Sequence, residues 1–247
     1  MPNHVINKVR FNCNQRDFLN ILEFIRCKNE DSIDTFLGTI DFNNIIPMPE
    51  GLDIEASPKG KRCYELYDEY SKKIAEIGRE DADIYVYYVE KCGSEENLLL
   101  GKQYYENVQK YGTPTWYEWR NAYWGTKWNA YWCKNYEQDP EVNTEIEFYT
   151  AWSDVSGLIQ KLSEMFEGVE IDYWWADENI GFNVGHKEYY SGDEILRDIP
   201  VGDSKEAYEM AAWLYDLDLY EEGYALSDDE SAYEWTGINQ YTGEEIG

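Results

Sequence analysis

The sequence predicts an α+β protein with a βαββαβ order of elements, a long insertion and an acidic helical C-terminal extension. Apolar residues alternate with polar ones in short segments of both halves of the chain, which is typical of half-buried strands. Two other segments place apolar residues at helical spacing. Residues 206–247 hold twelve acids and no lysine or arginine. The βαββαβ order describes a four-stranded antiparallel sheet with two helices on one face, the ferredoxin-like arrangement.

The chain opens with a predicted strand and a predicted helix. Residues 5–11 form the strand, and Asp17 is placed to cap a helix that runs to Lys28 with one apolar face. The segment 41–49 contains two prolines, which favour a short extended stretch.

The inserted segment, at about 50–115, is predicted to contain a helix and a strand. Aromatic and aliphatic residues at helical spacing favour a helix over 61–77, and Gly78 is placed to end it. The run 84–90 is rich in β-branched and aromatic residues and favours a strand, with a continued helix as the alternative.

The second half of the chain supplies the remaining elements of the ferredoxin-like order. Thr115 and Glu118 match a capping box, in which each side chain bonds the backbone N–H of the other residue. The short helix that follows is expected to end before Gly125. Two alternating segments, a helical segment and two further alternating segments come next, at 127–133, 145–152, 156–167, 169–175 and 180–184. Residues 187–190 are a candidate extension or repeat of the last strand.

The C-terminal part is predicted to be a separate acidic extension. Residues 1–191 are expected to form the ferredoxin-like domain, with residues 192–247 packed on it. Asp203 or Ser204 is placed to cap a helix that runs to about Glu222. Ser227 and the acids after it are predicted to open another short helix.

The composition excludes several classes of protein. Lysine and arginine number 21 against 50 aspartates and glutamates, so the net charge is −29 at pH 7. Because affinity for phosphates comes from lysine and arginine, direct binding of duplex DNA or of an anionic membrane surface is not expected. With 43% hydrophobic and 17% aromatic residues, the chain has enough apolar surface to fold.

The cysteines and the amino end indicate the location and the cofactors. The five cysteines contain no C-x-x-C pair and leave an odd one, which fits neither a disulfide framework nor a zinc site. The amino end lacks the pattern of a secretory signal, and the aliphatic runs are too short for a membrane span. We therefore expect a cytoplasmic protein with no cofactor, no metal and no membrane association.

Four strings carry a resemblance to a known family. They are Met1-Pro2-Asn3, DFNNIIPMP at 41–49, YEWRNAYWGTKWNA at 117–130 and YTAWS at 149–153. Together they resemble the YubB-type ferredoxin-like proteins of phages and conjugative plasmids, over about residues 1–190. The sequence departs from that family at His4 and in the acidic segment after about residue 192. The resemblance implies the fold and a mobile-element origin, and it supplies no catalytic residues.

The aromatic residues and the histidines have both functional and structural interpretations. Eight aromatics stand between 116 and 132, either as a stacking platform for bases or sugars or as core. The core interpretation is favoured, since a platform needs only two or three aromatics. His4 and His186 have no nucleophilic or acidic partner at a useful spacing, so the protein is not expected to be an enzyme.

The C-terminal acids are the predicted partner-binding residues. Residues 216–234 hold eight acids and no base: Asp216, Asp218, Glu221, Glu222, Asp228, Asp229, Glu230 and Glu234. Negative charge at the carboxyl end of a helix is unfavourable by about 0.3–1 kcal/mol per group, so stability does not account for it. Mimicry of nucleic acid requires such clusters, because duplex DNA carries one charge per about 1.7 Å of its axis.

We therefore predict a non-enzymatic, acidic interaction protein encoded by a mobile element. In this hypothesis the acids form a single ridge that mimics nucleic acid and binds a basic nucleic-acid-binding protein in the cytoplasm of the host cell. Such a protein would inhibit a host defence system, as an anti-CRISPR or anti-restriction protein does. One alternative is a generic soluble accessory protein with incidental acidity. Another is a nucleotide or single-strand nucleic-acid binder that uses the aromatics of 116–132.

Overall fold

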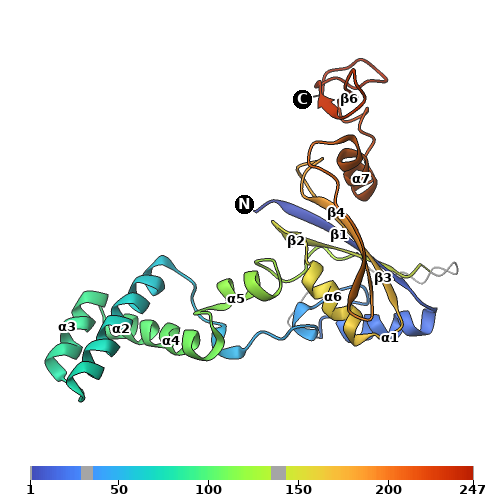
Figure 1. The fold of residues 1–247 in the computed structure, drawn as a ribbon. Coiled ribbons are helices and arrows are strands. Elements are labelled where there is room, and N and C mark those ends of the chain that lie inside the picture. The colour runs from blue at the N-terminus through green and yellow to red at the C-terminus, as the bar shows by residue number, and fades with distance from the viewer. Residues whose placement is uncertain (1, 29–35, 135–142, 247) are drawn as a thin grey trace. The chain divides into compact units, whose positions relative to one another are not determined.

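The computed structural model describes residues 2–28, 36–134 and 143–246, and the chain divides into two compact units. Unit 1 comprises Met1–Pro47 and Tyr123–Gly247, and unit 2 comprises Met48–Ala122. Unit 2 is therefore an insertion in the chain of unit 1 (Figure 1).

Unit 1 is built on a five-stranded antiparallel sheet with the strand order β2-β1-β3-β4-β5. The strands are β1 His4–Asn12, β2 Glu145–Ala151, β3 Glu170–Asp177, β4 Val184–Tyr190 and β5 Asp193–Asp198. The first three of these confirm the strands predicted at 5–11, 145–152 and 169–175. The sheet therefore extends into the segment after residue 191.

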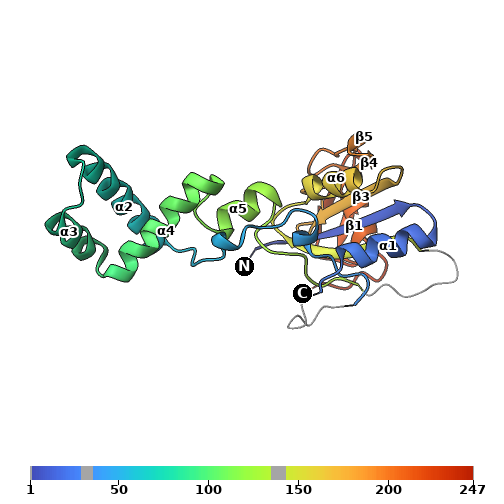
Figure 2. The ribbon, with the colours of Figure 1, turned by 90° about the horizontal axis from the view of Figure 1, so that it is seen from below.

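Two helices cover one face of the sheet, namely α1 Gln15–Ile25 and α6 Ser156–Met165 (Figure 2). The cap of α1 is Asn14 and not Asp17, because the Asn14 side chain accepts the backbone N–H of Asp17. Phe18 of α1 lies against Phe11 of β1, with ring centroids 5.7 Å apart. The buried residues of β1 that share the parity of Phe11 therefore point toward these helices.

The connection from β2 through α6 to β3 places β1 between two strands that run parallel to each other, as the ferredoxin-like fold requires. The strand predicted at 127–133 is not formed. Only Tyr131 pairs there, in an isolated antiparallel bridge to Tyr149 with N–O distances of 3.1 and 2.8 Å. Trp132 has a φ of +49°, in the left-handed region, so an extended strand cannot continue through it.

The sheet gains two strands at its other edge, where β4 and β5 follow β3 as hairpins. The strand predicted at 180–184 is wrong in its position, since β4 begins at Val184, whereas the candidate extension at 187–190 lies within β4. The preceding residues form a turn in which Phe182 N–H bonds the carbonyl of Asn179 and Asn183 has a φ of +44°.

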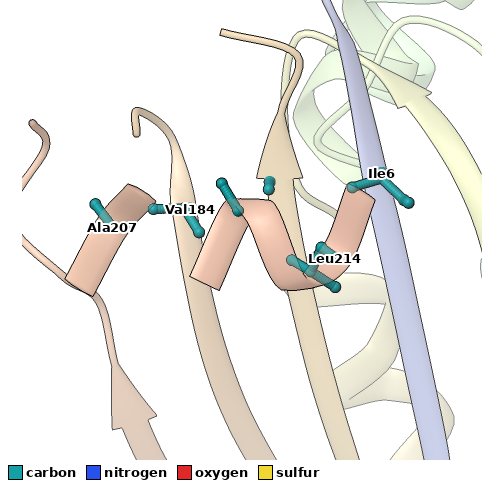
Figure 3. Packing of buried hydrophobic residues seen from close by; sticks show 6 residues of the cluster. Ile6, Val184, Ala207 and Leu214 are labelled. Carbon is teal, nitrogen blue, oxygen red and sulfur yellow. The ribbon is translucent and has the colours of Figure 1, made fainter. Parts of the chain in front are cut away.

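Helix α7, Lys205–Tyr215, covers part of the opposite face of the sheet. Figure 3 shows Ala207 and Leu214 of this helix beside Val184 of β4 and Ile6 of β1, and all four side chains belong to one buried cluster. The extension is thus joined to the sheet by an apolar contact.

Helix α7 begins where the sequence predicted, but it ends earlier than predicted. Ser204 caps the helix by accepting the N–H of Ala207 at 3.3 Å. The helix ends at Tyr215 and does not reach Glu222, because Asp216 adopts a left-handed conformation with a φ of +55°.

The chain after α7 forms a small hairpin of β6 Tyr224–Leu226 and β7 Tyr233–Trp235. Tyr233 packs with Tyr208 and Ala212 of α7, which attaches the hairpin to that helix. The helix predicted to begin at Ser227 is not formed. Its residues make the hairpin loop instead, because Ser and Asp side chains stabilise turns as readily as helix starts.

The WGTKWNA and DFNNIIPMP strings hold unit 1 together where the insertion leaves it. Asn129 accepts the backbone N–H of Phe42 at 2.9 Å and donates to the Asp41 carboxylate at 2.7 Å. The buried Trp124 donates its indole N–H to the Ile46 carbonyl at 2.9 Å. These residues of the two strings thus serve the fold in this protein.

Unit 2 is helical, with α2 Pro58–Ile77, α3 Ala82–Cys92, α4 Glu95–Tyr111 and most of α5 Trp116–Tyr123. Short 3-10 turns, η1 Phe42–Asn44 and η2 Glu50–Leu52, precede these helices in the chain. Helix α2 confirms the helix predicted at 61–77, and Gly78 follows it with a φ of +74°. In α5, Thr115 accepts the N–H of Tyr117, and its hydroxyl bonds the Glu118 carboxylate.

The strand predicted at 84–90 is a helix, α3. Asp81 caps its start by accepting the N–H groups of Asp83 and Ile84, and Gly93 ends it with a φ of +86°. The apolar residues Tyr85, Tyr88, Val89 and Cys92 recur at helical spacing and pack in one cluster with α2 and α4. Among all the helices of the described residues, none has the length and apolar character needed to cross a bilayer.

Candidate functional site

All eight acids predicted to bind a partner are exposed. Asp216, Asp218, Glu221 and Glu222 lie in the turn between α7 and β6, and we call them the first acidic group. Asp218 organises this turn, because its side chain accepts the backbone N–H of Tyr220 at 2.9 Å and the hydroxyl of Tyr241 at 3.1 Å.

Asp228, Asp229 and Glu230 lie in the loop of the β6–β7 hairpin, and we call them the second acidic group. Asp229 accepts hydrogen bonds from the hydroxyls of Ser231 at 2.7 Å and Ser227 at 2.9 Å. These bonds lower the pKa of Asp229 below its ordinary value. The loop is therefore held in a defined conformation that keeps a carboxylate ionised.

The two acidic groups adjoin opposite ends of β6. That strand has three residues, which corresponds to about 10 Å at about 3.3 Å per residue. Glu234 of β7 lies between the groups along the strand, opposite Ala225. The sequence led us to expect one ridge, whereas the hairpin separates the acids into two groups with Glu234 between them.

These acids lack the cationic partners that neutralise acids elsewhere in unit 1. Within the described part of the chain, none of the eight has a lysine or arginine nitrogen within 4.0 Å. On the sheet, by contrast, Glu145 pairs with Arg10 at 2.6 Å and Glu147 with Lys134 at 2.6 Å. The negative charge of the hairpin region is thus left to solvent or to a partner.

Sequence reasoning missed two acids that the fold adds to this region. The chain end turns back onto the first acidic group, where Gln240 N–H bonds the Tyr220 carbonyl at 2.9 Å. Glu244 and Glu245 are exposed on the same returning segment. In the sequence, the turn-forming residues around Gly243 indicate that the chain reverses direction there. They do not indicate which other part of the chain this turn approaches.

The aromatics of 116–132 are divided between the two units and between core and surface. Trp119 in unit 2 and Trp124 in unit 1 are buried, as the core interpretation expects. Trp132 in unit 1 is 61% exposed and lies on the ring of His4, with centroids 4.6 Å apart. Tyr117 and Tyr123 are exposed as well, so three aromatics of this stretch have surface that a ligand could contact.

Charged and aromatic side chains line the sheet on the face that α7 covers in part. The rings of Trp174 on β3 and His186 on β4 are stacked, with centroids 4.4 Å apart and an angle of 9° between the planes. The Arg10 guanidinium lies 5.2 Å from the Trp174 ring, and Lys8 lies 4.8 Å from the ring of Trp213. This face combines cations and π-systems over three neighbouring strands.

His186 has acidic neighbours that the sequence analysis did not recognise. Its Nε2 lies 3.7 Å from Asp172 Oδ1 and 3.8 Å from Glu188 Oε1. Glu188 stands two residues along the same strand, and Asp172 is directly opposite Glu188 on β3. The prediction that His186 has no acidic partner at a useful spacing was therefore wrong. Glu188 lies on the same face of the strand because side chains two residues apart share a face, and the register of β3 and β4 brings Asp172 close to the imidazole.

The match to a family model supports the fold. Residues 127–218 match the sequence model described as the ferredoxin-like domain in Api92-like protein. The crystal structure of the protein api92 from Yersinia pseudotuberculosis is similar with a TM-score of 0.39 and 11% sequence identity, over 82% of this chain and 99% of that one. No match to a curated protein was found.

The ferredoxin-like class predicted from the sequence is thus confirmed. The matched domain model covers β2, α6, β3, β4, β5 and α7, so it includes the helix that joins the extension to the sheet. The matched description is that of Api92-like protein, and the resemblance to YubB-type proteins stays a prediction.

Proposed function

We propose that this protein is a non-enzymatic acidic interaction protein that binds a basic partner through the two acidic groups and Glu234. The observation that carries the proposal is the exposure of all eight carboxylates with no cationic partner among the described residues. Acids that served only the fold would be expected to pair, as Glu145 and Glu147 do on the sheet. A basic surface would supply the missing counter-charges.

The partner we propose is a nucleic-acid-binding protein of the host cell. Its channel for nucleic acid would be lined by lysine and arginine, which are the residues that contact phosphates. The placement of the acidic groups beyond opposite ends of a strand about 10 Å long favours an extended basic groove over a single compact pocket. The protein would then act as a nucleic-acid mimic and compete with the natural ligand for that channel.

The finer form of the proposal concerns the biological setting. The resemblance to phage and plasmid proteins suggests a mobile-element origin, and proteins that block nucleic-acid channels would benefit such an element when the channel belongs to a defence system. We therefore propose inhibition of a CRISPR effector or a restriction enzyme. Plaque counts of a restricted phage, with and without expression of this protein, test that form: unchanged restriction in every system tried would contradict it.

The binding itself is tested by capture from a host lysate followed by competition with duplex DNA. The test variant is Asp216→Asn, Asp218→Asn, Glu221→Gln and Glu222→Gln. The matched control changes four exposed acids of unit 2 that form no ion pair within the described residues, namely Glu65→Gln, Glu69→Gln, Glu90→Gln and Glu96→Gln.

The two variants lose the same net charge, so they separate position from total charge. We expect wild type and control to capture a protein that duplex DNA displaces, and the test variant to lose it. Capture of the same proteins by all three forms would contradict the proposal, and so would a captured protein that DNA does not displace.

A further inference from the structure

A second site lies on the sheet, away from the acidic groups. Asp172 and Glu188 face each other across β3 and β4, and His186 is the next residue on the same face of β4. One ligand atom of each side chain lies within 4.8 Å of the others. All three residues are partly buried, so the cluster is not a chance meeting of mobile surface acids.

The distances within this cluster are too long for hydrogen bonds. Nε2 of His186 stands 3.7 and 3.8 Å from the two carboxylate oxygens, whereas N–H···O bonds lie at 2.7–3.2 Å. The same Nε2 is buried and has no hydrogen-bond partner. A buried nitrogen without a partner is uncommon. It indicates that an additional group binds there, either one that accepts electron density from the nitrogen lone pair or one that accepts its proton.

A bound cation accounts for these distances. Two ligands at about 2.1 Å from a tetrahedral ion stand about 3.4 Å apart, which is close to both observed separations. A cation would also offset the repulsion between Asp172 and Glu188, because like charges directly opposite each other on neighbouring strands are destabilising. Arg10, which stands directly opposite Asp172 on β1, is bonded to Glu145.

The neighbours of the cluster orient its ligand atoms. Asn12 donates to Oδ2 of Asp172 at 3.1 Å, which directs the other oxygen, Oδ1, toward His186. Trp174 stacks on the imidazole and fixes the plane of the ring. Hydrogen bonds to ligating carboxylates and fixed ring orientations are typical of metal sites in proteins.

We propose that Asp172, His186 and Glu188 bind a divalent transition-metal ion of the zinc type. The donor set of one imidazole and two carboxylates suits such an ion, whereas Mg²⁺ and Ca²⁺ prefer sites made of oxygen alone. Three protein ligands leave a fourth position for water or for a ligand. The site is independent of the proposed partner binding, since none of its ligands belongs to the acidic groups.

The test is calorimetric titration of the full chain with ZnCl₂ at neutral pH. We expect one saturable site in the wild type, binding at least 100-fold weaker in His186→Ala, and binding at least tenfold weaker in Glu188→Gln. The isosteric Glu188→Gln variant guards against loss of the fold. The matched controls are His4→Ala and Asp193→Asn, which are expected to bind Zn²⁺ like the wild type.

The fifty acids of the chain give a background of weak cation binding, and two further measurements distinguish the site from it. Mg²⁺ and Ca²⁺ at the same concentration are expected not to displace Zn²⁺. Because the chain has two histidines, NMR of the imidazole nitrogens separates them, and Zn²⁺ is expected to shift the signals of His186 and leave those of His4 unchanged.

Three results would overturn this proposal. They are the lack of a saturable Zn²⁺ site in the wild type, an unchanged affinity in His186→Ala, and equal responses of both histidines in the NMR spectra. Displacement of Zn²⁺ by equimolar Mg²⁺ or Ca²⁺ would also overturn it, since the cluster would then act only as a group of acids.

Discussion

Replacement of Tyr173 by phenylalanine is expected to destabilise unit 1 by about 2–6 kcal/mol. The Tyr173 hydroxyl donates to Oδ1 of Asn7 at 2.6 Å and accepts the backbone N–H of Val155 at 2.8 Å. Asn7 in turn donates to the hydroxyl of Thr150 at 2.9 Å, and all four residues are buried. The substitution leaves one buried acceptor and one buried donor without a partner, and each such group costs about 1–3 kcal/mol.

Urea unfolding of the full chain, followed by tryptophan fluorescence, measures this change. Trp175 stacks on the Tyr173 ring at a centroid distance of 5.3 Å and reports on this part of unit 1. Tyr190→Phe is the matched control, because the Tyr190 side chain is 46% exposed and its change is expected to stay within about 0.5 kcal/mol. A Tyr173→Phe variant as stable as this control would refute the reasoning that the network is buried and satisfied.

Three further substitutions test other parts of the structure. Leu214→Ala removes a buried side chain between α7 and the sheet, so it is expected to lower the free energy of unfolding by about 2–4 kcal/mol, as measured by urea unfolding. A decrease below about 1 kcal/mol would contradict the packing of α7 on the sheet. Gly101→Ala would place a Cβ 2.2 Å from the Cys63 carbonyl oxygen, so the melting temperature of the helical insertion, followed by circular dichroism, should fall; an unchanged value would contradict the close approach of α2 and α4. Burial of Glu145 opposes its ionisation, but the bonds from Arg10 and Lys8 outweigh this effect and lower its pKa below the ordinary value of a glutamate. Its contribution to stability is present above that value and is lost as the pH falls through the folded pKa, so Glu145→Gln should lose less stability on acidification than the wild type. Equal acid sensitivity of the two proteins would contradict this role.

The sequence predicted the elements of the sheet wherever alternation extended over a whole strand. The sequence-based prediction failed where the conformation of a single residue or a single helix cap determines the secondary structure. The alternation of 127–133 is real, but the left-handed backbone of Trp132 ends the pairing after one bridge. The residue types of 84–90 favour a strand, but Asp81 and Gly93 cap the segment as a helix.

The candidate sites could be predicted only in part. The number of acids in residues 206–247 predicted that many of them are exposed, because twelve acids without a lysine or arginine cannot all be buried. This number could not show that a hairpin divides the acids, since its turn at Ser227 uses the same residue types as a helix start. Asp172 and His186 are fourteen residues apart in the chain and meet through the register of β3 and β4, which no local pattern encodes.

The separation of the acidic groups has a quantitative consequence. The span of about 10 Å along β6 exceeds the screening length of about 8 Å at physiological salt. The first and second acidic groups should therefore contribute almost independently to binding. Neutralising each in turn would then change log Kd by amounts that add in the combined variant.

The salt dependence of the dissociation constant between this protein and its captured, DNA-displaceable partner tests the central claim most directly. With isothermal titration over a series of NaCl concentrations, we predict a steep loss of affinity for the wild type and a shallower slope when Asp216, Asp218, Glu221 and Glu222 are neutralised. An affinity that does not change with salt, or equal slopes for the two proteins, would contradict the claim that these carboxylates form the contact.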